Sequence, residues 1–165
     1  MPRILFVCIA NICRSPMARA VARSWCGKSI QRDLRLQFEA AGTHVQRGGV
    51  AIDPRARAAL SKRGYEAGRE RSRQVTAADI EKSDAVLAMD LNSLAALRRL
   101  CPAGHSDKLS LLLDAVPGRQ GQEVPDPYFG PPQGFDRVLD LCEVGVRELL
   151  SRWGVKPTGI PPNRE

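Results

Sequence analysis

The stretch from Arg3 to Pro16, which reads RILFVCIANICRSP, constrains the fold more than any other part of the chain. Its early residues, Ile4 to Val7, form a short apolar run of β-favouring residues, which predicts a buried strand. Ser15 is a good helix N-cap and Pro16 is a good first helical residue, so a helix is expected directly afterwards. The sequence therefore predicts a strand, a tight loop that begins at Cys8, and a helix.

A loop between a strand and a helix N-terminus presents several backbone amides, and this geometry binds an oxyanion. It also favours the thiolate form of a cysteine inside the loop, here Cys8. Arg14 adds a planar guanidinium that fits two phosphate oxygens. The spacing alone is weak evidence, because a Cys six residues before an Arg occurs three times, starting at Cys8, Cys13 and Cys26. Only Cys8 follows a predicted strand and precedes a capped helix; the alternative is an inert buried thiol.

The loop resembles the phosphate-binding loop of the low-molecular-weight protein tyrosine phosphatases, whose usual string is C-x-G-N-I-C-R-S-P. The matching residues here are Cys8, Ile9, Ala10, Asn11, Ile12, Cys13, Arg14, Ser15 and Pro16, with Ala10 in place of the usual Gly. A second motif, Asp126 to Gly130, reads DPYFG and resembles the family's D-P-Y-[YF]-G. The two motifs stand in the family's order, and the resemblance runs from about Ile4 to about Trp153.

Length and composition indicate one globular domain. The chain has 165 residues, enough to bury a real core, and we expect a domain over residues 1–154 and a loose tail over 155–165. Five cysteines without a close pairing pattern favour a reducing, cytoplasmic compartment over a disulfide scaffold. A strand at the very start argues against a signal peptide, and no stretch approaches transmembrane length, so no membrane partner is expected.

Charge and residue types bear on the partners. The absence of a C-x-x-C motif and the presence of two His argue against a metal site. The net charge of +7 invites a nucleic-acid interpretation, but the arginines are scattered and aromatics are few, so no nucleic-acid partner is expected. A basic surface instead favours acidic partners electrostatically.

Strands and helices alternate along the rest of the chain. We expect further strands at 36–41, 85–89 and 109–113, and a long amphipathic helix over 135–153. Between them, helices are expected after Asp53, at the Thr76 and Asp79 capping box, and after Asp90 or Asn92. This alternation predicts an α/β fold, a single domain with a parallel sheet and helices on both faces, and ligands at the carboxyl ends of strands. The resemblance implies a four-stranded parallel sheet in the order 2-1-3-4.

The resemblance also implies roles for individual residues. Cys8 would attack phosphorus, Arg14 would hold equatorial oxygens, and Asp126 would act as general acid and then base. On composition alone, the pattern favours Asp126 before Pro as a turn residue; the loop at Cys8 and the resemblance favour the catalytic role. Tyr128, Phe129 and Gln46 would line the substrate cleft, and Cys13 could trap oxidised Cys8 as a disulfide. The expected phosphate-binding residues are Ile9, Ala10, Asn11, Ile12, Cys13, Arg14 and Ser15; no cofactor and no metal are required.

Three positions depart from the family's pattern. Gln46 stands near a position that is often aromatic, Arg19 stands where Glu is usual, and no His occurs in the stretch around Glu70 that often carries one. Such a His would support the Ser15 and Asn11 network, so we expect that support to be absent or supplied by Glu70 or an Arg. These departures concern substrate preference and turnover, not the reaction type.

The expected function is hydrolysis of phosphotyrosine in proteins and of other aryl phosphate monoesters. An arsenate-reductase-like redox enzyme would need a close Cys pair in mid-chain, but no Cys lies between Cys26 and Cys101. A sugar-transport phosphocarrier would not need Arg14 or Asp126. A catalytically weak phosphoprotein-binding module stays an alternative. Protein-arginine phosphatases tend to have a small polar residue where Ile12 stands, so Ile12 favours an aryl substrate.

Overall fold

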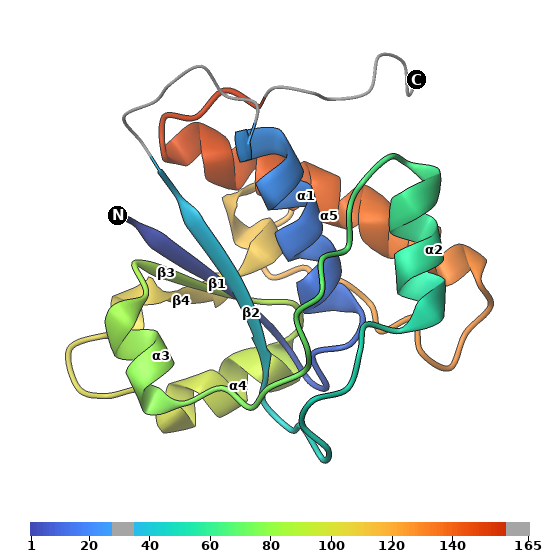
Figure 1. Cartoon of the computed structure of the whole chain (residues 1–165). Coiled ribbons are helices and arrows are strands. Elements are labelled where there is room, and N and C mark those ends of the chain that lie inside the picture. The colour runs from blue at the N-terminus through green and yellow to red at the C-terminus, as the bar shows by residue number, and fades with distance from the viewer. Residues whose placement is uncertain (28–34, 158–165) are drawn as a thin grey trace.

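The computed structural model describes residues 1–27 and 35–157, and its centre is a parallel sheet of four strands. The strands lie in the order β2-β1-β3-β4, which confirms the expected order (Figure 1). Their bounds are β1 Arg3–Cys8, β2 Gln37–Gly42, β3 Ala85–Ala88 and β4 Leu109–Leu111. Because β1 lies between β2 and β3, the loop that follows Cys8 starts at the middle of the sheet's carboxyl edge.

The side chains of β1 alternate between two hydrophobic clusters, one on each face of the sheet. Ile4, Phe6 and Cys8 belong to the larger cluster, whereas Leu5 and Val7 belong to the smaller one. A strand that is buried on both faces needs apolar residues at every position. This explains why the run is continuously apolar instead of alternating with polar residues.

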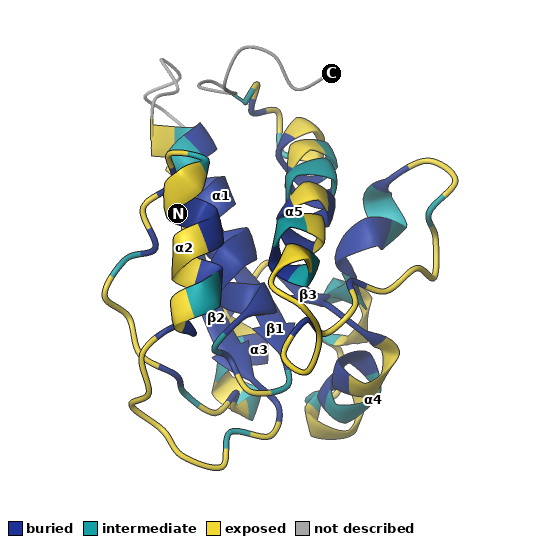
Figure 2. Ribbon diagram, turned by 90° about the vertical axis from the view of Figure 1, so that its right-hand side faces the viewer, coloured by how far each residue is buried: buried dark blue, intermediate teal, exposed yellow. Residues whose placement is uncertain are grey.

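Helices cover both faces of this sheet, as expected. On one face, α1 Arg14–Gly27 packs against α5 Gln133–Arg152, and α2 Pro54–Lys62 contacts both of them. On the other face lie α3 Ala77–Lys82 and α4 Leu91–Leu100, which bury Ile80, Leu94 and Leu97. Short 3₁₀ helices span Ser106–Lys108 and Leu112–Ala115. Figure 2 shows α1 buried over most of its length, so the loop before it is attached to one of the most enclosed helices.

Side-chain caps fix where three helices begin. Asp53 caps α2, and Thr76 and Asp79 form the expected capping box of α3. Asp90, not Asn92, caps α4 by accepting the backbone N–H of Ser93. These local signals are confirmed because each one satisfies a backbone donor that the helix itself leaves unpaired.

Strands β2 and β3 and the end of α5 differ from expectation by one residue, and three other boundaries differ in a more informative way. Helix α1 begins at Arg14, so Ser15 lies in its first turn instead of capping it, and the Ser15 hydroxyl is used elsewhere. Strand β4 ends at Leu111, where the chain enters a 3₁₀ helix because the Asp114 carboxylate accepts the Leu111 N–H. Helix α5 begins at Gln133, before the first apolar residue of its periodic pattern. An apolar run alone does not distinguish a strand from a 3₁₀ turn.

At the carboxyl end, Val155 is buried and donates its backbone N–H to the Leu150 carbonyl at 2.8 Å. The domain boundary after residue 154 stays a prediction, and residues 158–165 of the expected tail lie outside the described part. So do residues 28–34, on which most of the expected polar connection after α1 falls. None of the helices described for the chain is long and apolar enough to cross a bilayer.

Candidate active site

The loop formed by residues 8–15 joins β1 to α1 and is held by backbone hydrogen bonds to two other segments. The Thr43 N–H donates to the Cys8 carbonyl and the His44 N–H donates to the Ile9 carbonyl, both at 2.9 Å. The Asp53 N–H donates to the Ile12 carbonyl, also at 2.9 Å. With these carbonyls occupied by the segments after β2, the geometry of the loop is fixed by its surroundings.

Asn11 makes the sharp turn within this loop. Its φ of 58° lies in the left-handed region, and it is the one non-glycine residue with positive φ in the described chain. Asn tolerates this conformation better than most residues. Ala10 is not in the left-handed region, so it takes the place of the family's usual Gly without backbone strain.

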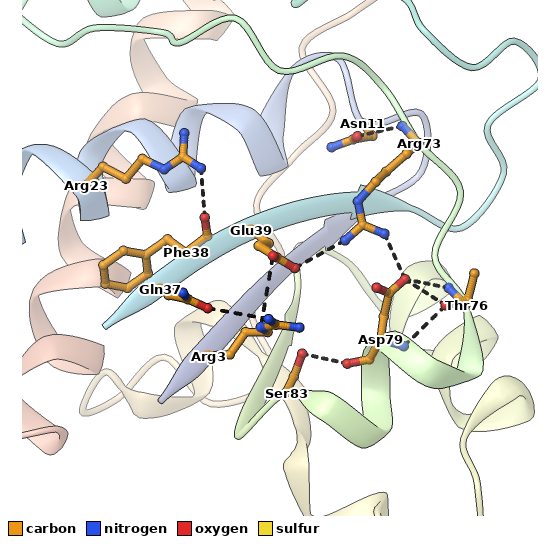
Figure 3. Close-up of polar contacts among 10 residues, drawn as sticks. All are labelled: Arg3, Asn11, Arg23, Gln37, Phe38, Glu39, Arg73, Thr76, Asp79 and Ser83. Carbon is orange, nitrogen blue, oxygen red and sulfur yellow. Dashed lines mark hydrogen bonds and ion pairs between the residues drawn. The ribbon is translucent and has the colours of Figure 1, made fainter. Parts of the chain in front are cut away.

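The Asn11 side chain is supported from both ends. Its Nδ2 donates to Ser15 Oγ at 2.9 Å, and its Oδ1 accepts the backbone N–H of Arg73 at 3.0 Å (Figure 3). The Arg73 guanidinium in turn contacts Asp79 and Glu39, which anchors this segment to α3 and β2 (Figure 3). The support that a His often supplies in the family was expected to be absent or to come from Glu70 or an Arg; here it comes from an Arg, through the backbone amide of Arg73.

Glu70 has a different role from the one considered for it. Its carboxylate pairs with two arginines of α1, Arg23 and, at 3.5 Å, Arg19. Arg19 is buried, and burial lowers its pKa below the usual range despite the nearby Glu70 charge, with the positive charges of Arg23 and Arg73 acting in the same direction as burial. The unusual residue at position 19 is thus matched by a carboxylate at position 70.

Cys8 lies at the start of the loop, with its sulfur 3.0 Å from Ser15 Oγ. Ser15 Oγ accepts from Asn11 and lies 3.4 Å from the Ala41 carbonyl, so its hydroxyl proton can point to Cys8 Sγ or to that carbonyl. A hydroxyl that donates to sulfur stabilises a thiolate. This contact explains why Ser15 lies within the first turn of α1 instead of capping the helix.

Arg14 is buried and is held from behind. Its Nη1 donates to Asp90 Oδ2 at 2.6 Å and to the Val124 carbonyl at 3.0 Å, and its Nη2 lies 3.7 Å from Asp126 Oδ2. Burial alone would lower the pKa of Arg14, but the negative charges of Cys8 and Asp90 raise it above its usual range. Arg14 therefore carries a permanent positive charge at the loop.

Asp90 is the buried partner of Arg14 at the end of β3. Burial alone would raise its pKa, but hydrogen bonds from Ser93 and the charge of Arg14 lower the pKa below its usual range. The residue expected to have a structural role thus caps α4 with one oxygen and binds Arg14 with the other.

Asp126 reaches the loop from the long connection between β4 and α5. This connection is tied to the sheet edge where the Val124 N–H donates to the Met89 carbonyl at 2.8 Å. Asp126 Oδ1 accepts the Tyr128 N–H at 3.1 Å, which is the turn contact, while Oδ2 faces Arg14. One carboxylate oxygen of Asp126 therefore makes the contact expected of a turn residue, and the other oxygen lies beside the 8–15 loop.

Arg55 is a functional candidate that the sequence interpretation missed. It binds Asp53 through two nitrogens, with Nε at 3.1 Å from Oδ1 and Nη2 at 2.9 Å from Oδ2. It also donates to the Tyr128 carbonyl at 2.9 Å, and its guanidinium lies 5.1 Å from the Tyr128 ring centre. Because Asp53 is bonded to Ile12, Arg55 connects the 8–15 loop to the segment that carries Asp126. The signal was the Asp-Pro-Arg string at positions 53–55, interpreted only as a helix start.

The 8–14 part of the loop, the 44–50 segment and the segment that carries Asp126 line one cavity of about 400 Å³. Its floor is the 8–15 loop, one wall is the 44–50 segment with Gln46, and the other carries Asp126, Tyr128 and Phe129. The Tyr128 and Phe129 rings meet edge to face at 4.9 Å between centroids, and Phe129 is 94% exposed at the mouth. The structure therefore brings every predicted loop and cleft residue except Ser15 to the cavity itself; Ser15 lies behind Cys8.

Cys13 lines the same cavity but is mostly buried. Burial and the nearby Asp53 charge raise the pKa of Cys13 to about 12, so it is a protonated thiol at neutral pH. All five cysteines are free. Within the described ranges, no group of three or more His, Cys, Asp or Glu side chains could hold a metal ion.

Comparison with known proteins agrees with this geometry. The family model for low molecular weight phosphotyrosine protein phosphatase matches residues 3–157. The chain belongs to this family. A low molecular weight protein-tyrosine-phosphatase of Streptomyces coelicolor is 38% identical, covering 90% of this chain and 92% of that protein.

Two solved structures of this family's fold are informative. A protein tyrosine phosphatase from Entamoeba histolytica, with Hepes in its active site, gives a TM-score of 0.86 at 32% identity, covering 93% of this chain and 97% of that chain. The YwlE arginine phosphatase from Geobacillus stearothermophilus gives a TM-score of 0.79 at 27% identity, covering 93% of this chain and 94% of that chain. The low molecular weight phosphatase fold is thus shared by relatives named for different phosphoryl groups.

Proposed function

We propose that the chain hydrolyses phosphotyrosine in proteins, and other aryl phosphate monoesters, through a phosphocysteine formed on Cys8. The observation that carries the proposal is that Asp126, from the connection between β4 and α5, meets Cys8 and Arg14 of the 8–15 loop at one cavity. A purely structural loop would not need a buried arginine that is backed by a buried carboxylate.

In the first step, the Cys8 sulfur attacks phosphorus and the bond from phosphorus to the phenolic oxygen breaks. The backbone amides of the loop and the Arg14 guanidinium hold the equatorial oxygens, whose charge persists through the transition state. Protonated Asp126 gives its proton to the leaving oxygen. Its exposed position at the cavity lets it reach a group that arrives from solvent, since its side chain is 47% exposed.

In the second step, ionised Asp126 takes a proton from water while the water oxygen attacks phosphorus. The bond from phosphorus to sulfur breaks, inorganic phosphate leaves and the Cys8 thiolate returns. Ser15 stabilises that thiolate by hydrogen bonding, and Asn11 holds Ser15 in place. Neither of these two steps uses a cofactor or a metal.

The proposal also specifies the phosphorylated group, phosphotyrosine. Tyr128 and Phe129 give the cavity an aromatic wall that packs against a flat ring. The similar arginine phosphatase makes phosphoarginine the second candidate, but Ile12 gives the floor an apolar side chain, which suits a phenyl ring better than a guanidinium. Phosphotyrosine proteins of the cytoplasm are the proposed substrates, since five free cysteines suit a reducing compartment.

The test is hydrolysis of phenyl phosphate, a phosphotyrosine peptide and a phosphoarginine peptide by the wild type and by Cys8→Ser. We expect the wild type to hydrolyse both aryl substrates and Cys8→Ser to fall to background while still binding vanadate, because the amides and Arg14 remain. Cys101→Ser, a half-buried cysteine at the end of α4, is the matched control and should keep full activity. Activity of Cys8→Ser above a few per cent, or turnover of phosphoarginine alone, would contradict the proposal.

A further inference from the structure

The wall of the cavity opposite Tyr128 and Phe129 is the 44–50 segment, and a second segment, residues 69–72, hydrogen-bonds to it from behind. The segment 47–50 pairs with Ser72: the Gly49 N–H donates to the Ser72 carbonyl at 2.8 Å, and the Ser72 N–H donates to the Val50 carbonyl at 2.8 Å. The Ser72 hydroxyl lies 3.0 Å from the Val50 nitrogen and 3.2 Å from the Arg47 carbonyl. These bonds hold the chain around residue 72 against the 47–50 segment, from which Arg47 and Val50 line the cavity.

The alternation of side chains around Ser72 places arginines on the outside of this wall. Ser72 is buried, and Glu70 faces α1, where it pairs with Arg19 and Arg23. Arg69, which precedes Glu70, and Arg71, which lies between Glu70 and Ser72, are exposed. Arg71 lies across the neighbouring segment, with its Nη1 3.3 Å from the Gly49 carbonyl.

Arg47 stands on the other segment of the wall. It is exposed and lines the same cavity as Cys8. In the described part of the chain, none of the three arginines of this wall, Arg47, Arg69 and Arg71, forms an ion pair within 4.0 Å.

Three carboxylates on the elements around this wall are already paired with other arginines. Glu70 binds Arg19 and Arg23 of α1, Asp53 binds Arg55, and Asp126 faces Arg14. Arg73, the next arginine along, differs from the three because Asp79 and Glu39 neutralise it (Figure 3). Three uncompensated positive charges therefore stand on these two hydrogen-bonded segments: Arg47 lines the cavity itself, and Arg69 and Arg71 lie on the segment behind it. Together they attract negative charge.

We propose that this wall, which we call the arginine wall (Arg47, Arg69 and Arg71), binds an acidic peptide segment that flanks the phosphorylated residue. The inference rests on the proposed phosphotyrosine phosphatase function. A residue bound at Cys8 leaves its own peptide neighbours at the rim, so the flanking side chains are the groups that reach the wall. The arginine wall thus selects acidic phosphotyrosine sites over neutral ones.

The size of the preference follows from exposed ion pairs. Each such pair contributes roughly 1.5- to 5-fold in affinity, so two or three pairs give roughly tenfold in kcat/KM. Because the charges are exposed, the preference falls as ionic strength rises from 0.01 to 0.15 M, over which the Debye length shrinks from about 30 to about 8 Å.

The experiment measures kcat/KM for three substrates: phenyl phosphate, a phosphotyrosine peptide with Asp and Glu on both sides, and the same peptide with Asn and Gln instead. The readout is the ratio of the acidic to the neutral peptide. In the wild type we expect a ratio of roughly ten at low salt. Arg71→Gln should lower the ratio by roughly 1.5- to 5-fold, and Arg69→Gln and Arg47→Gln should act in the same direction.

Two variants control for structural effects. Arg71→Lys keeps the charge and should keep most of the ratio, which a role limited to the bond with Gly49 does not predict. Arg98→Gln removes an equally exposed charge two turns along α4 from Asp90 and should leave the ratio unchanged.

Hydrolysis of phenyl phosphate distinguishes a failure of the arginine-wall inference from a failure of the proposed phosphatase function. A wild type that hydrolyses phenyl phosphate but has a ratio of one would overturn the arginine wall alone. A wild type that hydrolyses none of the three substrates would overturn the proposed function, and the inference with it. Binding to vesicles containing phosphatidylserine through Arg69 and Arg71, together with a ratio of one, would assign the wall to a membrane surface and also overturn the inference.

Discussion

Replacing Asp90 tests how much the site depends on the carboxylate behind Arg14. Asp90 has two contacts: one oxygen accepts from Arg14 Nη1 at 2.6 Å, and the other accepts from the Ser93 N–H at 2.7 Å. Asn can still cap α4 but carries no charge, whereas Ala loses both contacts. The two variants therefore separate the ion pair from the helix cap.

The expected magnitudes follow from burial. Removing one partner of a buried ion pair costs about 3–5 kcal/mol, and a hydrogen bond to a charged group contributes about 1.5–3 kcal/mol. Arg14 keeps a longer ion pair with Asp126 at 3.7 Å and a bond to the Val124 carbonyl, which softens the loss. We therefore expect Asp90→Asn to lose about 2–3 kcal/mol of unfolding free energy, and Asp90→Ala to lose about 1 kcal/mol more.

Urea unfolding at pH 7 and phenyl phosphate turnover check this prediction. Turnover of Asp90→Asn should fall by about 10- to 100-fold, because the Arg14 fork is no longer held in place. The lowered pKa of Asp90 means that its stabilising contribution is present above the unfolded pKa of about 3.9. The contribution is lost as the pH falls through the folded pKa, so the stability gap between wild type and Asp90→Asn should close in acid. Equal stability and equal turnover at pH 7 would refute the reasoning.

Gly42→Ala should damage the 8–15 loop, because the added Cβ would lie 2.6 Å from the Ile9 carbonyl oxygen; vanadate affinity should drop, and unchanged affinity would contradict the close approach. Arg55→Lys should slow phosphotyrosine turnover more than p-nitrophenyl phosphate turnover, because lysine cannot bind Asp53 through two nitrogens and still hold the Tyr128 carbonyl. Arg57→Lys, on the exposed side of α2, is its control, and equal effects on the two substrates would remove the positioning role. Peroxide should inactivate the enzyme, and dithiothreitol should restore it much less well in Cys13→Ser. Since burial raises the pKa of Cys13 to about 12, disulfide formation should accelerate about tenfold per pH unit from pH 7 to 10, and a flat profile would argue against Cys13 as the attacking thiol.

Much of the fold was predictable because its signals are local. The continuous apolar run of β1, the Thr76 capping box and the Asp-Pro start at Asp53 each determine structure within a few residues. The strand order came from the family resemblance, since alternating strands and helices do not by themselves define which strand lies beside which. The end of β4 was not predictable from the run over 109–113, because Leu112 and Leu113 are buried in a 3₁₀ helix as well as they would be in a strand.

The sequence predicts the residues of the site whose side chains carry the chemistry. It does not predict the supporting contacts between residues that lie far apart in the sequence. Cys8, Arg14 and Asp126 stand in recognisable motifs. The amide of Arg73 that supports Asn11 is 62 residues away from it, and a backbone N–H has no signature in the sequence. The bond from Arg55 to the Tyr128 carbonyl spans 73 residues and depends on how α2 packs beside the Asp126 segment.

The central claim, that Asp126 protonates the leaving group of a phosphoryl transfer to Cys8, predicts a dependence on leaving-group basicity. A phenolate such as that of tyrosine has a parent pKa of about 10, so expelling it without a proton is slow. A positioned acid contributes about 10²–10⁴-fold to such a step, and a nitrophenolate needs much less help.

The most direct measurement is kcat for a series of substituted phenyl phosphates, plotted against leaving-group pKa, for the wild type and Asp126→Asn. Asp136→Asn, in the first turn of α5, serves as the matched carboxylate control and should follow the wild type. We expect a clearly steeper slope for Asp126→Asn, with the largest loss for the most basic phenols. Parallel lines for the wild type and Asp126→Asn would contradict it and would leave Asp126 with its turn contact to Tyr128 alone.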